Sequence, residues 1–143
     1  MKVLVGSTPG GLISFVSPAY GGSTSDRQIV ERSSLPRMCD PKDSVMADKG
    51  FNVQDIFAPY DVTVNIPTFF KKKNKMQSKT VINDRKIASK RVHIERLIGL
   101  GKTYKILSMK DPMNMWEAQM ATQISFVVYM LCNFRTNIVH KNG

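Results

Sequence analysis

The sequence has little cysteine and no long hydrophobic segment. Its two cysteines, Cys39 and Cys132, are far apart and show neither the spacing of a zinc site nor a disulfide framework, so a reducing compartment is expected. The most apolar window, over residues 124–131, is far shorter than the ~20 residues that a membrane span requires. Residues 1–6 lack the apolar core of a signal peptide. These absences predict a soluble protein without a membrane partner, and Cys132 is expected in its core because it lies in an apolar run.

Acidic residues are also scarce. The 143 residues include 11 Asp and Glu against 21 Lys and Arg, which gives a net charge of +10. Such an excess favours a polyanionic partner, either nucleic acid or an acidic membrane surface, although basic globular proteins without such a partner also exist. The length and the hydrophobic content of 42% are those of one globular domain with its own core.

The first half of the sequence predicts short strands and helices. Two apolar runs, over residues 2–6 and 12–17, flank a Pro-Gly-Gly turn and predict a β-hairpin. A helix is expected over about residues 26–34, because Ser25 and Gln28 have the spacing of a capping box. The other predicted elements are a loop over residues 36–41, a buried strand over 43–48, a short helix over 53–58 and a strand over 62–66.

The second half predicts two long helices. They cover about residues 78–100 and 113–133 and are joined through a short strand or extended link over 104–107. Gly99 and Gly101 are expected to loosen the end of the first helix. In the last helix, an apolar repeat at helical spacing predicts the face that packs in the core. This face consists of Trp116, Met120, Ile124, Val127 or Val128, and Leu131.

The first long helix carries a distinctive charge pattern. At 3.6 residues per turn, Arg91, Glu95 and Lys102 project within ~40° of one another, so one carboxylate lies between two cations on one stripe. An apolar seam beside this stripe is expected to face a core. The seam consists of Ile87, Ile94, Ile98 and, further round, Leu97. The pattern suits a metal or phosphate site, and it also suits a plain helix with intrahelical ion pairs.

Two further carboxylates stand at the ends of predicted elements. Asp26 lies in the first turn of its predicted helix, where an acidic residue either caps the helix or serves a site. Asp48 follows a predicted strand and precedes a glycine turn at Gly50. At that position α/β sheets present catalytic groups, and an aspartate there also commonly bonds its own backbone.

A lysine run follows the predicted strand over 62–66. Lys71, Lys72, Lys73 and Lys75 crowd four positive charges into five residues. Such a run is typical of a solvated loop, of a surface that contacts phosphates and, less specifically, of a nuclear-import signal.

Taken in order, these motifs resemble the catalytic domain of PIF/Harbinger-type DDE transposases. The matching stretches are Tyr-Gly-Gly-Ser-Thr-Ser-Asp over residues 20–26, Met-Ala-Asp-Lys-Gly-Phe over 46–51, and the trio Arg91, Glu95 and Lys102. Each stretch is weak alone, and the match lies in their order between a hairpin and an apolar helix. The resemblance covers residues 1–134 as one domain and leaves a polar tail over 135–143.

The resemblance implies an α/β fold of the ribonuclease H-like kind, a mixed sheet flanked by helices. It implies that Asp48 and Glu95 are catalytic and that both, together with Asp26, hold divalent ions, either Mg²⁺ or Mn²⁺. Arg91 and Lys102 would support Glu95 or contact a phosphate, and the lysine run would contact the DNA backbone. DNA is the implied partner and the nucleus the implied location.

Two departures from the family pattern modify this expectation. The family's conserved tyrosine position falls on Ala88, and its first catalytic aspartate lies on a strand upstream of Lys2. The chain is therefore expected to be an N-terminally incomplete endonuclease domain that lacks the first strand, is inactive alone and relies on a separate DNA-binding protein or domain. The alternatives are a catalytically dead basic module that binds DNA or another protein, and a small basic protein bound to an unrelated partner.

Overall fold

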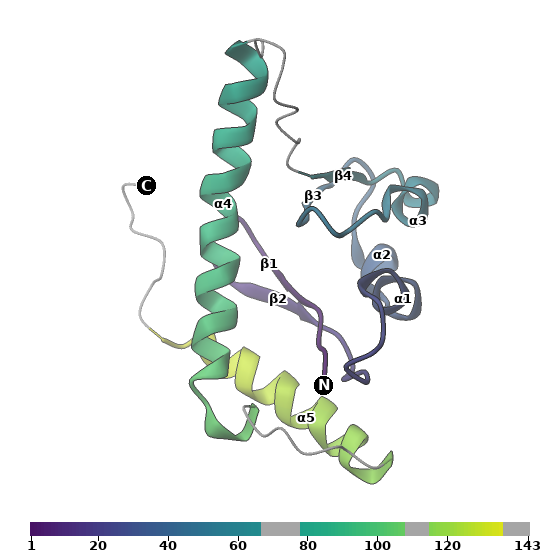
Figure 1. Cartoon of the computed structure of the whole chain (residues 1–143), viewed down its shortest axis with the longest axis vertical. Helices are drawn as coiled ribbons and strands as arrows, with labels where there is room; N and C mark the ends of the chain where they lie inside the picture. Colours follow the sequence, from purple (N-terminus) through teal and green to yellow (C-terminus); the bar gives the residue numbers. More distant parts are fainter. Residues whose placement is uncertain (67–77, 108–114, 136–143) are drawn as a thin grey trace.

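The computed structural model describes residues 1–66, 78–107 and 115–135. Short strands and helices alternate in its first part, and two long helices make up the rest (Figure 1). The elements are β1 (Val5–Ser7), β2 (Ile13–Val16), α1 (Asp26–Arg32), α2 (Leu35–Met38), β3 (Ser44–Met46), α3 (Gln54–Phe57), the 3-10 turn η1 (Ala58–Tyr60), β4 (Thr63–Asn65), α4 (Ser78–Lys102), the 3-10 turn η2 (Lys105–Leu107) and α5 (Met115–Cys132). The protein is of mixed α/β class, as predicted. No helix in the described ranges is long and apolar enough to cross a membrane.

The N-terminal hairpin confirms the prediction. Strands β1 and β2 are antiparallel, with Val5 opposite Val16. Gly11 lies in the turn with a φ of 88°, a left-handed conformation that glycine adopts without steric cost. A bridge between Lys2 and Tyr20 continues the pairing beyond the regular strands, so the hairpin extends to Lys2.

The second pair of strands is parallel. Ser44 in β3 lies opposite Thr63 in β4, and both strands fall inside their predicted ranges. The prediction of a buried strand over 43–48 is wrong: Ser44 and Met46 are exposed, and Val45 is half-buried. Successive side chains of a strand point to opposite faces, and only the Val45 face meets a core. Within the described residues the two strand pairs are separate sheets, so a single ribonuclease H-like sheet stays a prediction.

Helix α1 begins with the predicted capping box. The Gln28 backbone N–H donates to the Ser25 hydroxyl, and the Gln28 side chain accepts a hydrogen bond from the Ser25 N–H. Arg27 connects α1 with α3 through Asp55, with 2.9 Å between Nη1 and Oδ1. The hydrogen bond from Arg27 lowers the pKa of the Asp55 carboxyl. The start of α1, which carries Asp26, is therefore fixed by local bonds.

Two segments expected to be irregular or extended are helical turns instead. Residues 35–38 form α2 rather than a loop, because Pro36 stands in the first turn, where its missing N–H is not needed. The predicted link over 104–107 contains η2, in which the Leu107 N–H donates to the Tyr104 carbonyl at 3.0 Å. A proline or a short apolar run therefore does not by itself indicate an extended chain.

Two hydrophobic cores hold these elements together. The first consists of Ile13, Leu97, Tyr129 and Cys132, from β2, α4 and α5. The second consists of Val30, Val53, Phe57 and Val62, from α1, α3 and their flanks. Val5 at the start of β1 packs against the first core and Leu4, just before β1, against the second, so this short segment connects the two cores. The predicted burial of Cys132 is confirmed, since only 2% of its surface is exposed.

The buried face of α5 includes Val128, one of the two predicted alternatives, but otherwise differs from the predicted face. The buried residues are Ala121, Ser125, Val128, Tyr129 and Cys132, whereas Met120, Val127 and Leu131 are exposed. Helix α5 is apolar around most of its circumference, so periodicity alone does not select one face. Contacts with β2 and α4 select it instead. The side chains of Trp116 and Ile87 lie outside the described part of the chain.

Gly101 marks a close contact between the two long helices. Helix α4 continues through both glycines to Lys102, so the prediction that Gly99 and Gly101 loosen its end is wrong. A Cβ atom on Gly101 would lie 2.4 Å from Cε1 of Tyr129, whereas Gly99 faces open space. The missing side chain of Gly101 thus allows the Tyr129 ring to lie against the α4 backbone.

A side-chain amide fixes the hairpin to the end of α5. Asn133 accepts a hydrogen bond from the Ile13 N–H at 2.7 Å and donates one to the Ile13 carbonyl at 2.9 Å. Further along α5, the Thr122 hydroxyl accepts a hydrogen bond from the Ala19 N–H at 2.9 Å. Side chains of α5 and of the residue that follows it therefore bond the backbone of β2 and of the segment after β2, and bonds of this kind satisfy polar groups that a strand edge leaves unpaired.

Substitution of the two glycines of α4 tests this helix contact. We expect Gly101→Ala to lower the free energy of unfolding by about 1–3 kcal/mol, because the added methyl group overlaps the Tyr129 ring. Gly99→Ala is the matched control and should raise the free energy by about 0.5–1 kcal/mol, since alanine favours an exposed helical position. Urea unfolding followed by circular dichroism measures both. Equal effects of the two substitutions would contradict the close packing at Gly101.

Candidate functional site

Asp48 lies in a turn directly after β3. The Ala47 N–H donates to the Asn65 carbonyl at 3.0 Å, and this bond continues the β3–β4 ladder by one residue. The Phe51 N–H then donates to the Asp48 carbonyl at 2.9 Å and closes the turn. In the same turn the Lys49 N–H donates to Oδ1 of Asp48 at 2.6 Å. One carboxylate oxygen therefore fixes the turn, as a structural aspartate would, while Oδ2 is directed elsewhere.

That second oxygen faces Arg91 of α4. The distance between Oδ2 of Asp48 and Nη2 of Arg91 is 3.4 Å. The same nitrogen lies 3.2 Å from Oε1 of Glu95, one helical turn further on. Two carboxylates that are far apart in the sequence therefore meet at one guanidinium nitrogen. The predicted ion pair between Arg91 and Glu95 is confirmed, whereas the contact between Arg91 and Asp48 was not predicted.

Water reaches all three side chains of this cluster. The side chains of Asp48 and Glu95 are 57% and 63% exposed, and that of Arg91 is 35% exposed. Exposed ion pairs of this kind contribute little to stability, because water screens the charges. The same exposure suits a hydrated hard cation, since Mg²⁺ keeps several waters and takes one or two carboxylates from a protein. Asp48 and Glu95 thus have the donor chemistry and the access that such an ion requires.

Asp26 lies in a different place. Its Oδ1 is 3.7 Å from Nζ of Lys2, and the Lys2 ammonium also donates to the Thr24 carbonyl at 3.0 Å. Asp26 lines a pocket of about 310 Å³ whose lining includes neither Asp48 nor Glu95. Within the described residues, no group of three or more His, Cys, Asp or Glu side chains is arranged to hold a metal ion. The structure therefore brings together two of the three predicted carboxylates.

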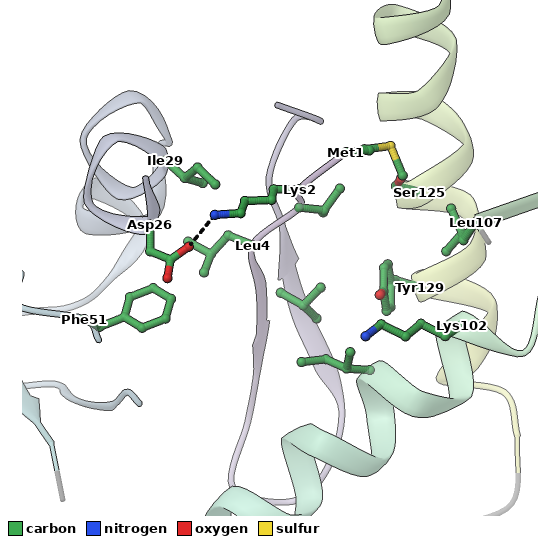
Figure 2. Close-up of a pocket in the computed structure, with 13 residues that line it drawn as sticks. Met1, Lys2, Leu4, Asp26, Ile29, Phe51, Lys102, Leu107, Ser125 and Tyr129 are labelled. Carbon is green, nitrogen blue, oxygen red and sulfur yellow. Dashed lines mark ion pairs between the residues drawn. The ribbon is translucent and has the colours of Figure 1, made fainter. Parts of the chain in front are cut away.

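The pocket beside Asp26 is bounded by β1, α1 and the two long helices. Figure 2 shows Lys102 extending into it from α4 and Tyr129 lining it from α5. The hydroxyl of Ser125, also in the lining, is buried and has no hydrogen-bond partner in the part of the chain that the structure describes. Burial raises the pKa of the Tyr129 phenol, so this hydroxyl remains neutral. The lining of the pocket is therefore mostly apolar and includes three charged side chains, those of Lys2, Asp26 and Lys102.

The predicted charge stripe of α4 divides between these two places. Arg91 and Glu95 belong to the cluster with Asp48, whereas Lys102, two turns further along, belongs to the pocket. No ion pair joins Glu95 to Lys102 among the described residues. Sequence reasoning missed the role of Lys2, for which the sequence offers no signal beyond its charge. The lysine run, Lys71, Lys72, Lys73 and Lys75, lies outside the described residues.

Comparison with protein families yields a match over most of the chain. A protein-family model described as DDE superfamily endonuclease matches residues 1–133. The matched region contains every described element from β1 to α5, and with them Asp26, Asp48 and Glu95. No curated protein and no solved structure shows significant similarity to the chain.

A double-mutant cycle tests the geometry of the cluster. We expect Arg91→Gln and Asp48→Asn to be coupled by about 0.2–1 kcal/mol in the free energy of unfolding at low salt, as is usual for exposed ion pairs. The coupling should fall toward zero in about 1 M NaCl, where the Debye length is ~3 Å. Chemical unfolding of the wild type, the two single variants and the double variant measures it.

The matched control replaces Arg91 by another arginine of the same helix. Arg96 is exposed and forms no ion pair with Asp48 among the described residues. Its cycle with Asp48→Asn should show no coupling. Equal coupling of both arginines to Asp48 would contradict a direct contact.

Proposed function

Because this chain belongs to the DDE superfamily endonucleases, we propose that it binds divalent metal ions through Asp48 and Glu95 and acts on the phosphodiester backbone of DNA. The observation that carries this proposal is the shared nitrogen of Arg91, which lies within 3.4 Å of an oxygen of each carboxylate. Small changes of side-chain rotamer then suffice to direct both oxygens to one cation. Among the DDE endonucleases, the PIF/Harbinger type is the one that the sequence motifs support.

Each residue has a distinct part in this proposal. A divalent ion, when bound, polarises a phosphodiester and activates the attacking water or hydroxyl. The Lys49 N–H holds Oδ1 of Asp48, so Oδ2 keeps a fixed direction toward α4. Glu95 supplies the second carboxylate from a rigid helix. We propose that Lys102 and the lysine run contact the phosphates of the DNA backbone. Such contacts position the DNA but do not recognise its base sequence.

The catalytic set of this chain is incomplete in our proposal. Asp26 is the third carboxylate that the family resemblance implies, and its ion pair with Lys2 must open before it serves as a ligand. The first aspartate of the family pattern has no counterpart in residues 1–143. We therefore propose that metal binding by Asp48 and Glu95 persists in the isolated chain while cleavage is weak or absent.

Metal titration tests the proposed ligands directly. We expect Mn²⁺ binding, measured by electron paramagnetic resonance of the free ion, to weaken by at least about tenfold in Asp48→Asn and in Glu95→Gln, since loss even of groups around a metal costs 10–100-fold. Asp61→Asn is the matched control, because Asp61 is exposed and asparagine tolerates its positive φ of 56°. Any metal-dependent nicking of plasmid DNA should disappear in the same two variants. Unchanged Mn²⁺ affinity in both would refute the site.

A second candidate function is a basic DNA-binding module without chemistry. It is favoured by the net charge of +10 and by the convergence of only two carboxylates among the described residues. DNA binding that falls steeply with salt and is indifferent to Mg²⁺ and Mn²⁺ would support it over the first proposal. Absence of DNA binding at low salt would refute both candidate functions.

We further propose that the two strand pairs are parts of one ribonuclease H-like sheet, joined by a strand from polypeptide outside residues 1–143. Lys2 and Leu4 direct their backbone bonds toward Tyr20 and Ser17, so Val3 between them faces the opposite edge of β1. Leu4 also packs against the second core, against which Val45 of β3 and Val64 of β4 pack, and this keeps the two pairs close.

Strand addition tests this arrangement. A chain extended ahead of Met1 by a linker and a six-residue apolar strand should protect the Val3 amide from hydrogen exchange and raise the Tm, because the strand supplies acceptors and covers an edge. An extension of the same length built from glycine and serine is the control. Identical exchange at Val3 in both extended chains would contradict a vacant strand position beside β1.

A further inference from the structure

The guanidinium of Arg91 occupies the position that a cation in contact with both Asp48 and Glu95 would take. We infer that Arg91 is a built-in counterion that competes with the divalent metal for these two carboxylates and is released to a DNA phosphate when the metal binds. This inference rests on the proposed function, because it concerns the same two carboxylates. It adds a positioning residue whose partner changes with the state of the site.

The distances carry the first step. One nitrogen, Nη2 of Arg91, lies 3.4 Å from Oδ2 of Asp48 and 3.2 Å from Oε1 of Glu95. Two carboxylates that both contact one nitrogen lie near each other and repel. The positive charge that they share offsets this repulsion. The guanidinium therefore keeps the two oxygens directed toward a common point in the absence of any other cation.

Charge carries the second step. A divalent ion that took ligands from both carboxylates would lie within a few ångströms of Nη2, and like charges at so short a distance repel each other strongly near a protein surface. Asp48 Oδ1 is bound by the Lys49 N–H, so the oxygen that Arg91 contacts is the one directed toward α4. Arg91 and the metal thus require the same oxygens and exclude each other.

The position of Arg91 on α4 carries the third step. Its backbone is fixed in the helix, and its side chain is 35% exposed, so the released guanidinium swings into water beside the carboxylates. A substrate phosphate must approach that same place to reach a metal held by Asp48 and Glu95. Guanidinium binds phosphate oxygens through two parallel hydrogen bonds, which makes a freed arginine a suitable clamp for the backbone.

Metal affinity of Arg91 variants tests the competition without any measurement of activity. We expect Mn²⁺ to bind Arg91→Gln about three- to tenfold more tightly than the wild type, because the competing charge is gone. Arg91→Lys keeps the charge but not the planar fork, and its affinity should lie between the two. Arg96→Gln removes the same charge from another face of α4 and should change the affinity by less than about twofold, since distant exposed charges are screened.

Salt dependence of DNA binding tests the release. In the presence of Mn²⁺, the slope of log affinity against log salt should be steeper for the wild type than for Arg91→Gln by about one unit. The wild type then makes one additional phosphate contact, through Arg91. Both proteins are measured on the same duplex at the same Mn²⁺ concentration, so competition of the ion with DNA counterions cancels.

The outcomes separate this inference from the proposed function. If the wild type does not bind Mn²⁺, or binds it unchanged after Asp48→Asn and Glu95→Gln, the proposed metal site fails. If the wild type binds Mn²⁺ through these residues but Arg91→Gln binds it equally or more weakly, the site stands and the competition is overturned. Tighter Mn²⁺ binding with no difference in salt slope overturns the transfer of Arg91 to DNA.

Discussion

The contact between Gly101 and Tyr129 fixes the C-terminal end of α4 against α5, and the candidate site depends on the position of α4. The aromatic ring lies against the helix backbone where a Cβ atom would be 2.4 Å away, so the two long helices are held close at this point. Arg91 is ten residues earlier on the same helix, about 15 Å along its axis. A helix behaves as a stiff rod over that length, so a small tilt at the contact displaces Arg91 from Asp48. The geometry of the charged cluster therefore depends on packing in the apolar core.

The cluster also shows that side chains joined by weak ion pairs can still be held in defined positions. Its ion pairs are exposed and add little to stability, yet each carboxylate is placed by a stronger local structure. Asp48 belongs to a turn closed by one backbone hydrogen bond and by the bond from the Lys49 N–H to its own carboxylate, and Glu95 belongs to a long helix. Exposed charges on rigid supports exchange partners at low cost. That property is what a site for a hydrated ion and a polyanion needs.

Features set by neighbouring residues could be predicted from the sequence, and features set by distant contacts could not. The hairpin, the capping box at Ser25 and the ion pair between Arg91 and Glu95 each depend on residues a few positions apart. The buried face of α5 depends on what α4 and β2 present to it, so its periodicity pointed to Met120 and Leu131, which are exposed. For the same reason Gly101 was expected to loosen the end of α4, although it marks a close contact with Tyr129. The ion pair between Arg91 and Asp48 joins residues 43 positions apart, and no local sequence pattern predicts it.

The hydrogen bonds between Asn133 and Ile13 have a consequence for the order of folding. These residues are 120 positions apart, and the bonds secure β2 to the end of α5. During synthesis the backbone of Ile13 emerges 120 residues ahead of its side-chain partner Asn133. An isolated pair of strands is marginally stable in water. The hairpin must therefore remain in exchange with open forms until α5 is complete, and its final docking is a late step that closes a loop of 120 residues.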